Sequence, residues 1–357
     1  MTGPSVRVIA FYLPQFHPIA ENDQWWGKGF TEWTNATKAK PLFRGHYQPH
    51  LPADLGFYDL RVPETRLAQA QMARNYGIDG FCYYHYWFAG KRILERPFDE
   101  VLGSKQPDLP FCLCWANQTW TGIWHGAPDR VLIEQTYPGV ADHEHHFETL
   151  LAAFRDPRYI RVEDRPLFLF FVPYEIPDTR AVMQLWRDMA KRAGLPGLYL
   201  VGNAVGSHTP GELGLDASAR YNPPPMRPWF PRRRPIKWLK RRYQQVAGLP
   251  HVHSYEKVLA DLLPPETPGT VNYPCLLPNF DNTPRSGANG VVLHESTPAL
   301  FRIHAQQALE RVRDRDAEHR IVFIKSWNEW GEGNYLEPDQ RFGYGYLEVV
   351  REVFGAA

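Results

Sequence analysis

The amino-acid sequence predicts an α/β fold, a single (β/α)8 TIM-type barrel over residues 1–357 with long loops after its strands. Three observations predict it. Short apolar runs that fit buried strands alternate with amphipathic stretches that fit helices. Eight such runs are present, and strands that alternate with helices pair in parallel. Polar and aromatic residues collect directly after the runs, where a parallel barrel builds its site.

The elements follow one another along the whole chain. We expect strands at 6–13, 80–84, 111–115, 167–172, 198–201, 217–221, 273–277 and 321–324, the sixth being the weakest. We expect helices at 64–76, 97–102, 142–154, 179–193 and 297–313. Pro63 fits the start of the first helix and Gly77 its end, because proline suits a first helical turn and glycine tolerates the conformation that ends a helix. No repeat or linker divides the chain, so one domain is predicted.

Two loop insertions are longer than ordinary connections, at about 18–60 and about 223–270. Loops of this length usually serve a function. The second insertion contains a basic tract, residues 227–242, in which Lys and Arg alternate with Trp, Phe, Ile and Leu. This tract either forms a solvated helix with its Trp packed inward, which we favour, or contacts an anionic membrane surface or a lipid-linked glycan.

The composition restricts the class of protein. The net charge of +1 argues against a nucleic-acid-binding protein, and 14% aromatic residues suit a sugar-binding cleft as well as a core. Cys82, Cys112, Cys114 and Cys275 are expected to be buried free thiols of a reducing compartment. No signal peptide and no run near 18 apolar residues is apparent, so we expect a cytoplasmic protein, peripheral at the inner membrane face if the basic tract binds there.

The most informative motif follows the last predicted strand and reads Trp-Asn-Glu-Trp-Gly-Glu-Gly, residues 327–333. Burial penalises carboxylates unless they are paired or used. On a flat strand Glu329 and Glu332 would point to opposite faces, but a turn at Gly331 lets both face one pocket. Two carboxyls in different surroundings are what acid/base chemistry at a glycosidic bond requires. Glu329 and Glu332 are therefore the candidate catalytic residues.

Further polar and aromatic residues lie after the strands or in the first insertion, and we expect them to line one cleft. Indole rings suit the apolar faces of sugars, so Trp26, Trp33, Trp87 and Trp115 are expected to stack on a glycan. The predicted substrate-binding residues are Tyr12, His17, Trp26, Trp33, Tyr84, Tyr86, Trp87, Trp115, Asn117, Asn203, Asn222, Asp281, Arg285, Trp327, Asn328, Trp330 and Tyr335.

No metal or cofactor is predicted. The sequence lacks a phosphate-binding loop, a nucleophile elbow and a His-Glu-x-x-His motif. The run Asp-His-Glu-His-His at 142–146 lies at a predicted helix start, which favours a solvated first turn over a metal site.

Five long motifs, at residues 10–17, 29–35, 76–88, 110–117 and 327–333, together resemble the WbsX-type family, also described as glycoside hydrolase family 99-like. The resemblance covers essentially the whole chain and implies a (β/α)8 barrel connected with bacterial O-antigen or capsule. Family 99 itself contains retaining endo-α-mannosidases. By that resemblance Glu329 would act as the base towards the sugar 2-hydroxyl, and Glu332 as the general acid/base. Gly331 stands where those enzymes have histidine, so a preference for mannose does not carry over.

The sequence thus leaves three hypotheses. We favour a retaining, metal-independent glycoside hydrolase acting on an α-linked bacterial polysaccharide. The alternative is a WbsX-type glycosyltransferase in O-antigen or capsule biosynthesis, which the basic tract favours. The third is a non-catalytic glycan-binding barrel, which would not need two closely spaced carboxyls.

Overall fold

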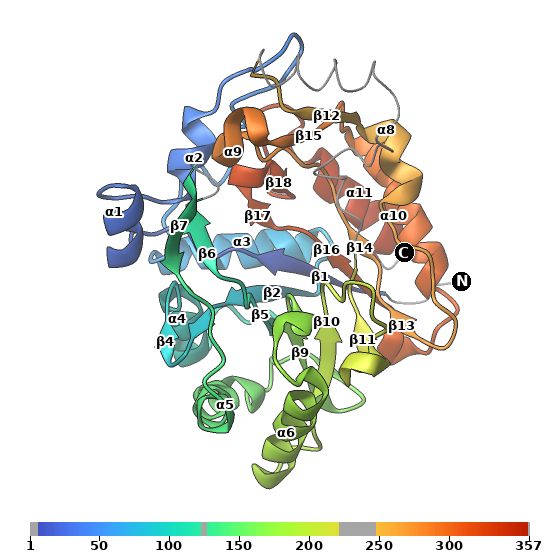
Figure 1. Cartoon of the computed structure of the whole chain (residues 1–357). Coiled ribbons are helices and arrows are strands. Elements are labelled where there is room, and N and C mark those ends of the chain that lie inside the picture. The colour runs from blue at the N-terminus through green and yellow to red at the C-terminus, as the bar shows by residue number, and fades with distance from the viewer. Residues whose placement is uncertain (1–5, 123–126, 221–247, 356–357) are drawn as a thin grey trace, which may run out of the picture.

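The computed structural model describes residues 6–122, 127–220 and 248–355, and its centre is a curled, mostly parallel sheet (Figure 1). In the order in which they pair, the strands are β13 (Val271–Asn272), β11 (Ala217–Ser218), β10 (Tyr199–Gly202), β9 (Arg165–Phe170), β5 (Phe111–Trp115), β2 (Gly80–His85), β1 (Arg7–Tyr12), β16 (Ile321–Ile324) and β14 (Cys275–Leu276).

The two ends of this sheet belong to one extended segment, residues 271–276. β13 pairs with β11, and β14 pairs with β16, where Cys275 lies opposite Phe323. Only Tyr273 and Pro274 separate β13 from β14, so the segment joins the two ends of the sheet as the seventh of eight strands. The predicted (β/α)8 barrel is confirmed. With residues 271–276 taken as one strand, each of the eight barrel strands overlaps a predicted run.

Helices lie around the outside of the sheet (Figure 1). They are α3 (Pro63–Asn75), α4 (Arg96–Ser104), α5 (Val140–Phe154), α6 (Thr179–Arg192), α10 (Pro298–Val312) and α11 (Gly345–Phe354). The first five overlap the predicted helices, whereas α11 has no counterpart in the sequence prediction. Gly77, just beyond α3, has a φ of 80°, which suits the end of a helix. The side chain of Thr297 accepts a hydrogen bond from the Leu300 amide and caps α10.

The strands are buried on both faces. Every residue of β2 and β5 is buried, since helices cover one face and the barrel interior the other. This is why these strands appear in the sequence as continuous apolar runs. The prediction of buried free thiols is confirmed, because all four cysteines are unpaired and buried.

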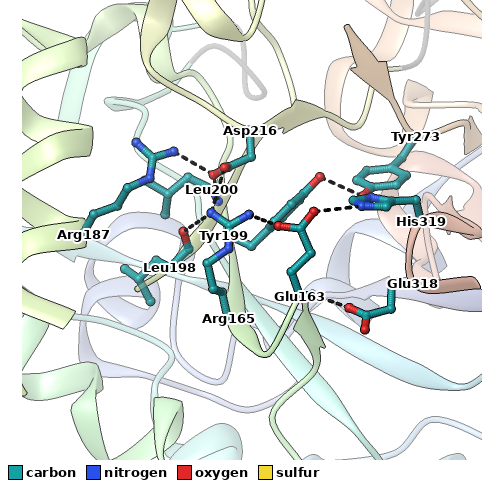
Figure 2. Close-up of polar contacts among 10 residues, drawn as sticks. All are labelled: Glu163, Arg165, Arg187, Leu198, Tyr199, Leu200, Asp216, Tyr273, Glu318 and His319. Atoms are coloured by element: carbon teal, nitrogen blue, oxygen red, sulfur yellow. Dashed lines mark hydrogen bonds and ion pairs between the residues drawn. The ribbon is translucent and has the colours of Figure 1, made fainter. Parts of the chain in front are cut away.

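A polar network lies near the N-terminal ends of the strands (Figure 2). Asp216 accepts hydrogen bonds from Arg165 at 2.9 Å and from Arg187 at 2.7 Å. The Tyr273 hydroxyl lies 2.9 Å from both the Tyr199 hydroxyl and His319 Nδ1. These contacts tie the start of β9 to the strands that follow it. In barrels of this kind this end serves stability rather than chemistry.

The loops that follow the strands carry additional elements, which gather on one side of the molecule (Figure 1). The first insertion forms α1 (Ala20–Trp26) and α2 (Glu32–Lys38), and the loop after β5 forms a hairpin of β6 (Trp120–Gly122) and β7 (Ala127–Ile133). The short helix α9 (Thr283–Ser286) follows β14. A two-stranded parallel sheet of β12 (His251–Ser254) and β15 (Val291–His294) lies nearby.

The second insertion is described only from residue 248, so the basic tract 227–242 lies outside the described residues. In the part of the chain that the structure describes, no helix has the length and apolar character needed to cross a membrane.

Candidate active site

A cavity of about 330 Å³ lies where the loops after the strands meet. Both predicted catalytic residues, Glu329 and Glu332, are in its wall. The residues that line it are Leu13, Gln15, Trp26, Phe30, Glu32, Asn35, Tyr84, Tyr86, Ala116, Gln118, Thr119, Trp120, Thr121, Leu132, Phe171, Arg285, Lys325, Glu329 and Glu332. Most come from the first insertion and from the C-terminal ends of β1, β2, β5 and β16, as expected for the site of a parallel barrel.

A tight turn after β16 brings the two glutamates together. Glu329 ends the short strand β17 (Asn328–Glu329), and Glu332 ends the 3-10 turn Trp330–Glu332. Gly333 follows with a φ of 54°, and the chain then returns as β18 (Asn334–Tyr335), antiparallel to β17. The predicted turn between the glutamates is therefore present, and it places them in the wall of one cavity.

Gly331 is needed for space rather than for the turn. A Cβ atom on this residue would lie 1.5 Å from Oε1 of Glu32 and 3.0 Å from Nε of Arg285. The carboxylate of Glu32, from α2, thus occupies the room that any side chain at position 331 would take. This position is the one at which the sequence departs from the family 99 motif, and the structure shows what fills it.

A buried lysine at the end of β16 contacts both glutamates. Lys325 Nζ donates to the two carboxylate oxygens of Glu329 at 3.0 and 3.2 Å, and lies 3.8 Å from Glu332 Oε2. It also donates to the hydroxyl of Tyr84 at 3.1 Å. One ammonium group therefore holds the two carboxyls close to each other.

Arg285, on α9, joins the other side of the pair to α2. Its Nε donates to Glu32 Oε1 at 2.8 Å, and its Nη1 donates to Glu332 Oε1 at 2.7 Å. Glu32 has no exposed surface. A buried carboxylate is tolerated when a charged partner compensates its lost hydration, and Arg285 is that partner.

The two catalytic candidates have unequal acidity. Burial raises the pKa of Glu329, and the charge on Glu332 raises it further, to about 7, despite Lys325. Burial also opposes ionisation of Glu332, but the charges of Lys325 and Arg285 outweigh it and lower that pKa to about 2. Without substrate at neutral pH, Glu329 and Glu332 together therefore carry at most one proton. Glu329 holds this proton, and Glu332 is ionised.

Aromatic residues also line the cavity. The rings of Trp120 and Tyr86 are 5.0 Å apart, and those of Trp26 and Phe30 are 6.1 Å apart. Trp26 and Trp120 are partly exposed, so part of each indole surface is accessible. Accessible indole surface in the same cavity as carboxylates suits a sugar ring, which has apolar C–H faces and hydroxyl edges.

Six of the predicted site residues meet at this cavity, namely Trp26, Tyr84, Tyr86, Arg285, Glu329 and Glu332. Asn222 lies outside the described residues. The others are buried away from the cavity wall: Tyr12, His17, Trp33, Trp87, Trp115, Asn117, Asn203, Asp281, Trp327, Asn328, Trp330 and Tyr335.

These buried residues support the loops instead. Trp33 donates to the Tyr58 carbonyl at 2.8 Å, and Asn328 exchanges hydrogen bonds with the backbone of Leu13. Trp330 stacks on Tyr335 with ring centroids 3.8 Å apart. Their surface is already covered by protein, so the structure gives Trp33, Trp87 and Trp115 no face on which a sugar could stack, contrary to expectation.

Sequence reasoning missed Lys325, Glu32, Asn35 and Trp120 as lining residues. A signal was present for two of them. Lys325 directly follows the last predicted strand, and Glu32 lies in the aromatic-rich motif of the first insertion. A charged residue at such a place is the same signal that identified Glu329.

Comparison with known proteins places this chain among glycan-related proteins. The family described as "Glycosyltransferase WbsX" matches residues 8–350. The "Uncharacterized protein WxcX" of two strains of Xanthomonas campestris pv. campestris is 38% identical over 353 residues, which are 98% of this chain and 50% of the relative. The chain thus spans about half the length of the curated relatives it matches.

Solved structures share the fold at low sequence identity. A protein named "Glycoside hydrolase-like protein" superposes with a TM-score of 0.59 at 15% identity, over 100% of this chain and 96% of that one. The GH99 endo-α-mannosidase of Bacteroides thetaiotaomicron, in complex with bis-tris propane, superposes with a TM-score of 0.54 at 14% identity, over 98% and 95%. The fold is that of family 99, and the chain belongs to the WbsX glycosyltransferase family.

Proposed function

We propose that this chain is a retaining, metal-independent glycoside hydrolase that acts on an α-linked bacterial polysaccharide. The observation that carries the proposal is the pairing of Glu329 and Glu332 in one cavity, which partly exposed indoles also line. Carboxyls whose surroundings push their pKa values apart are the usual source of an acid and a base at one site. The pair supplies both proton donor and acceptor, so the mechanism needs no metal.

The mechanism that we propose assigns Glu329 to the sugar 2-hydroxyl and Glu332 to the leaving oxygen. In the free cavity Glu329 holds the proton of the pair. A hydroxyl that donates to Glu329 stabilises its ionised form, and a glycosidic oxygen that accepts from Glu332 stabilises its neutral form. Substrate binding therefore draws the proton from Glu329 to Glu332.

The bond changes then balance. Glu329 takes the proton of the 2-hydroxyl while O2 attacks the anomeric carbon and the glycosidic bond breaks. Glu332 gives its proton to the departing oxygen, which leaves a 1,2-anhydro sugar. Glu332 next removes a proton from water, which opens the anhydro ring, and Glu329 returns its proton to O2. Two inversions at the anomeric carbon give overall retention.

The pair must carry one proton in this mechanism, which fixes the pH dependence. Above the pKa of about 7 of Glu329 both carboxyls are ionised and no proton is left for the leaving oxygen. We expect kcat/KM to be level below pH 7 and to fall about tenfold per pH unit above it, because kcat/KM reports the free enzyme. A rate that rises between pH 7 and 9 would contradict the one-proton pair.

Replacing Lys325 with methionine should move this pH limit. The Lys325 charge lowers the pKa of Glu329, so its removal lets the pair keep its proton to higher pH. An opposite charge at this distance shifts a carboxyl pKa by about 1–3 units. We therefore expect the pH at which kcat/KM begins to fall to move upward by about 1–3 units. An unmoved limb in a folded variant would show that Lys325 does not set the acidity of the pair.

One observation favours a second function, since the matching family is described as a glycosyltransferase. In this alternative the cavity would hold an activated sugar and an acceptor glycan on a lipid carrier. The basic tract 227–242 would then contact the membrane. The alternative requires an added sugar donor, which the hydrolase does not.

The deciding experiment is incubation of the protein with isolated O-antigen and capsular polysaccharides, with and without nucleotide sugars. A hydrolase shortens a polysaccharide without any nucleotide sugar, and chromatography detects the shorter chains. Extension that depends on a nucleotide sugar would establish the transferase. Binding without any change of chain length would leave a glycan-binding barrel.

A further inference from the structure

Two residues that line the cavity each carry a buried hydrogen-bond acceptor that has no partner among the residues that the structure describes. The acceptors are Oε2 of Glu32 and Oδ1 of Asn35. Glu32 has no exposed surface and Asn35 is 3% exposed, so bulk water does not satisfy these atoms either. Buried polar atoms without partners are rare in native proteins, because each has lost its hydration without replacement.

The two residues belong to one short helix. Glu32 and Asn35 lie three residues apart on α2, which places them on the same face of the helix. Reciprocal hydrogen bonds between Thr31 and Thr34 cap the start of α2. Arg285 holds Oε1 of Glu32 and leaves Oε2 for another partner. The space opposite Gly331 is filled by this same carboxylate, so it has little freedom to turn away.

We propose that Glu32 and Asn35 recognise the sugar ring bound beside Glu329 and Glu332, by accepting hydrogen bonds from two hydroxyl or ammonium groups of that ring. The inference rests on the proposed function for the position of the ring. It assigns Glu32 and Asn35 as specificity-determining residues and names the substrate class as neutral or amino sugars.

The charges around the cavity exclude uronic acids from this class. The two cations, Lys325 and Arg285, already contact the carboxylates of Glu329, Glu332 and Glu32. When Glu329 holds the proton of the pair, the two positive charges of Lys325 and Arg285 equal the two negative charges of Glu332 and Glu32. Among the residues that line the cavity, Lys325 and Arg285 are the only cations, and both are already engaged. A carboxylate on the sugar would meet the free oxygen of Glu32, and like charges at close range repel.

The test uses bis-tris propane, a diamine rich in hydroxyls, alongside sorbitol and glucuronate. Ligand-observed NMR titration measures their binding to the full chain and to the Glu32→Gln and Asn35→Ala variants. Glutamine presents an N–H donor where the carboxylate offers an acceptor, so we expect Glu32→Gln to bind bis-tris propane about 10–100-fold more weakly. Asn35→Ala should weaken binding less. The control is Glu21→Gln in the same insertion, which removes an ion pair with Lys91 outside the cavity.

The three probes separate the donor groups. Weakening of bis-tris propane alone would show recognition of ammonium, and weakening of sorbitol as well would show recognition of hydroxyls. Glucuronate should bind the wild type most weakly and gain affinity in Glu32→Gln. Unchanged binding of both bis-tris propane and sorbitol in folded Glu32→Gln and Asn35→Ala, or no binding to the wild type, would overturn the inference.

Gly331→Ala tests the same contact without changing any titratable group. Its Cβ must displace the Glu32 carboxylate, so we expect a lower Tm and weaker binding of bis-tris propane. Glu32→Ala combined with Gly331→Ala should recover Tm relative to Gly331→Ala, because the clash is gone, but should not recover binding. Full binding by Gly331→Ala would count against the inference. If the Glu32 variants bind normally and polysaccharide is still cleaved, the inference fails while the proposed function stands.

Discussion

Glu329→Gln is expected to abolish cleavage of the polysaccharide while leaving the fold intact. Glutamine has the same shape as glutamate, but it cannot take a proton from the 2-hydroxyl or hold the proton of the pair. General acid–base assistance contributes about 10²–10⁴-fold. Because the same residue also activates the attacking hydroxyl, we expect the loss to reach at least the upper end of that range. Reducing ends released per minute measure it, and Tm checks the fold.

Substrate chemistry tests the role of Glu329 independently. A substrate with fluorine or hydrogen in place of the 2-hydroxyl should be inert to the wild type, since it lacks the internal nucleophile. Glu175→Gln serves as the control for Glu329→Gln, because Glu175 is exposed and does not line the cavity. A covalent ester between Glu329 and the sugar, detected by mass spectrometry, would show an ordinary enzymatic nucleophile instead.

Glu332→Gln is expected to lower turnover of the polysaccharide by about 10²–10⁴-fold, because a sugar alkoxide leaves poorly without a proton. A substrate with an activated aryl leaving group needs little protonation and should be largely spared in the first step. The comparison of the two substrates by initial rates separates loss of the acid from general damage to the site. Glu329→Gln should show no such sparing.

Equal losses on both substrates would remove Glu332 from the role of acid. Sparing in Glu329→Gln rather than in Glu332→Gln would reverse the two roles. That result would mean that Glu329 keeps the proton of the pair when substrate binds, as it does without substrate.

The barrel could be predicted because its signals are local in sequence. Each strand is a short apolar run, and helix boundaries such as Pro63 and Thr297 depend on neighbouring residues alone. The turn that brings Glu329 and Glu332 together also lies within seven residues. Apart from α11, which the sequence analysis did not identify, prediction succeeded where the determining contacts are close along the chain.

The remaining site residues depend on contacts between distant segments. Glu32 is joined to Glu332 by Arg285, which lies 253 positions from Glu32 along the chain. Nothing local distinguishes Trp26, which lines the cavity, from Trp33, which is buried seven residues later. An aromatic residue near a strand end suits the core as well as a cleft, and only tertiary packing decides between them.

Gly331 shows how one contact between distant segments explains a local sequence feature. In sequence the glycine indicates a turn, whereas in the structure it leaves room for the Glu32 carboxylate. The aromatic-rich motif of the first insertion and the glutamate motif after the last strand therefore form a single site.

The most direct test of the central claim is an NMR time course of polysaccharide cleavage, which follows the anomeric proton of the new reducing end without any nucleotide sugar. The proposed pair predicts that the α-anomer appears first and equilibrates later, and that neither Glu329→Gln nor Glu332→Gln produces it at a comparable rate. First appearance of the β-anomer, or a reaction that starts only when a nucleotide sugar is added, would contradict the account.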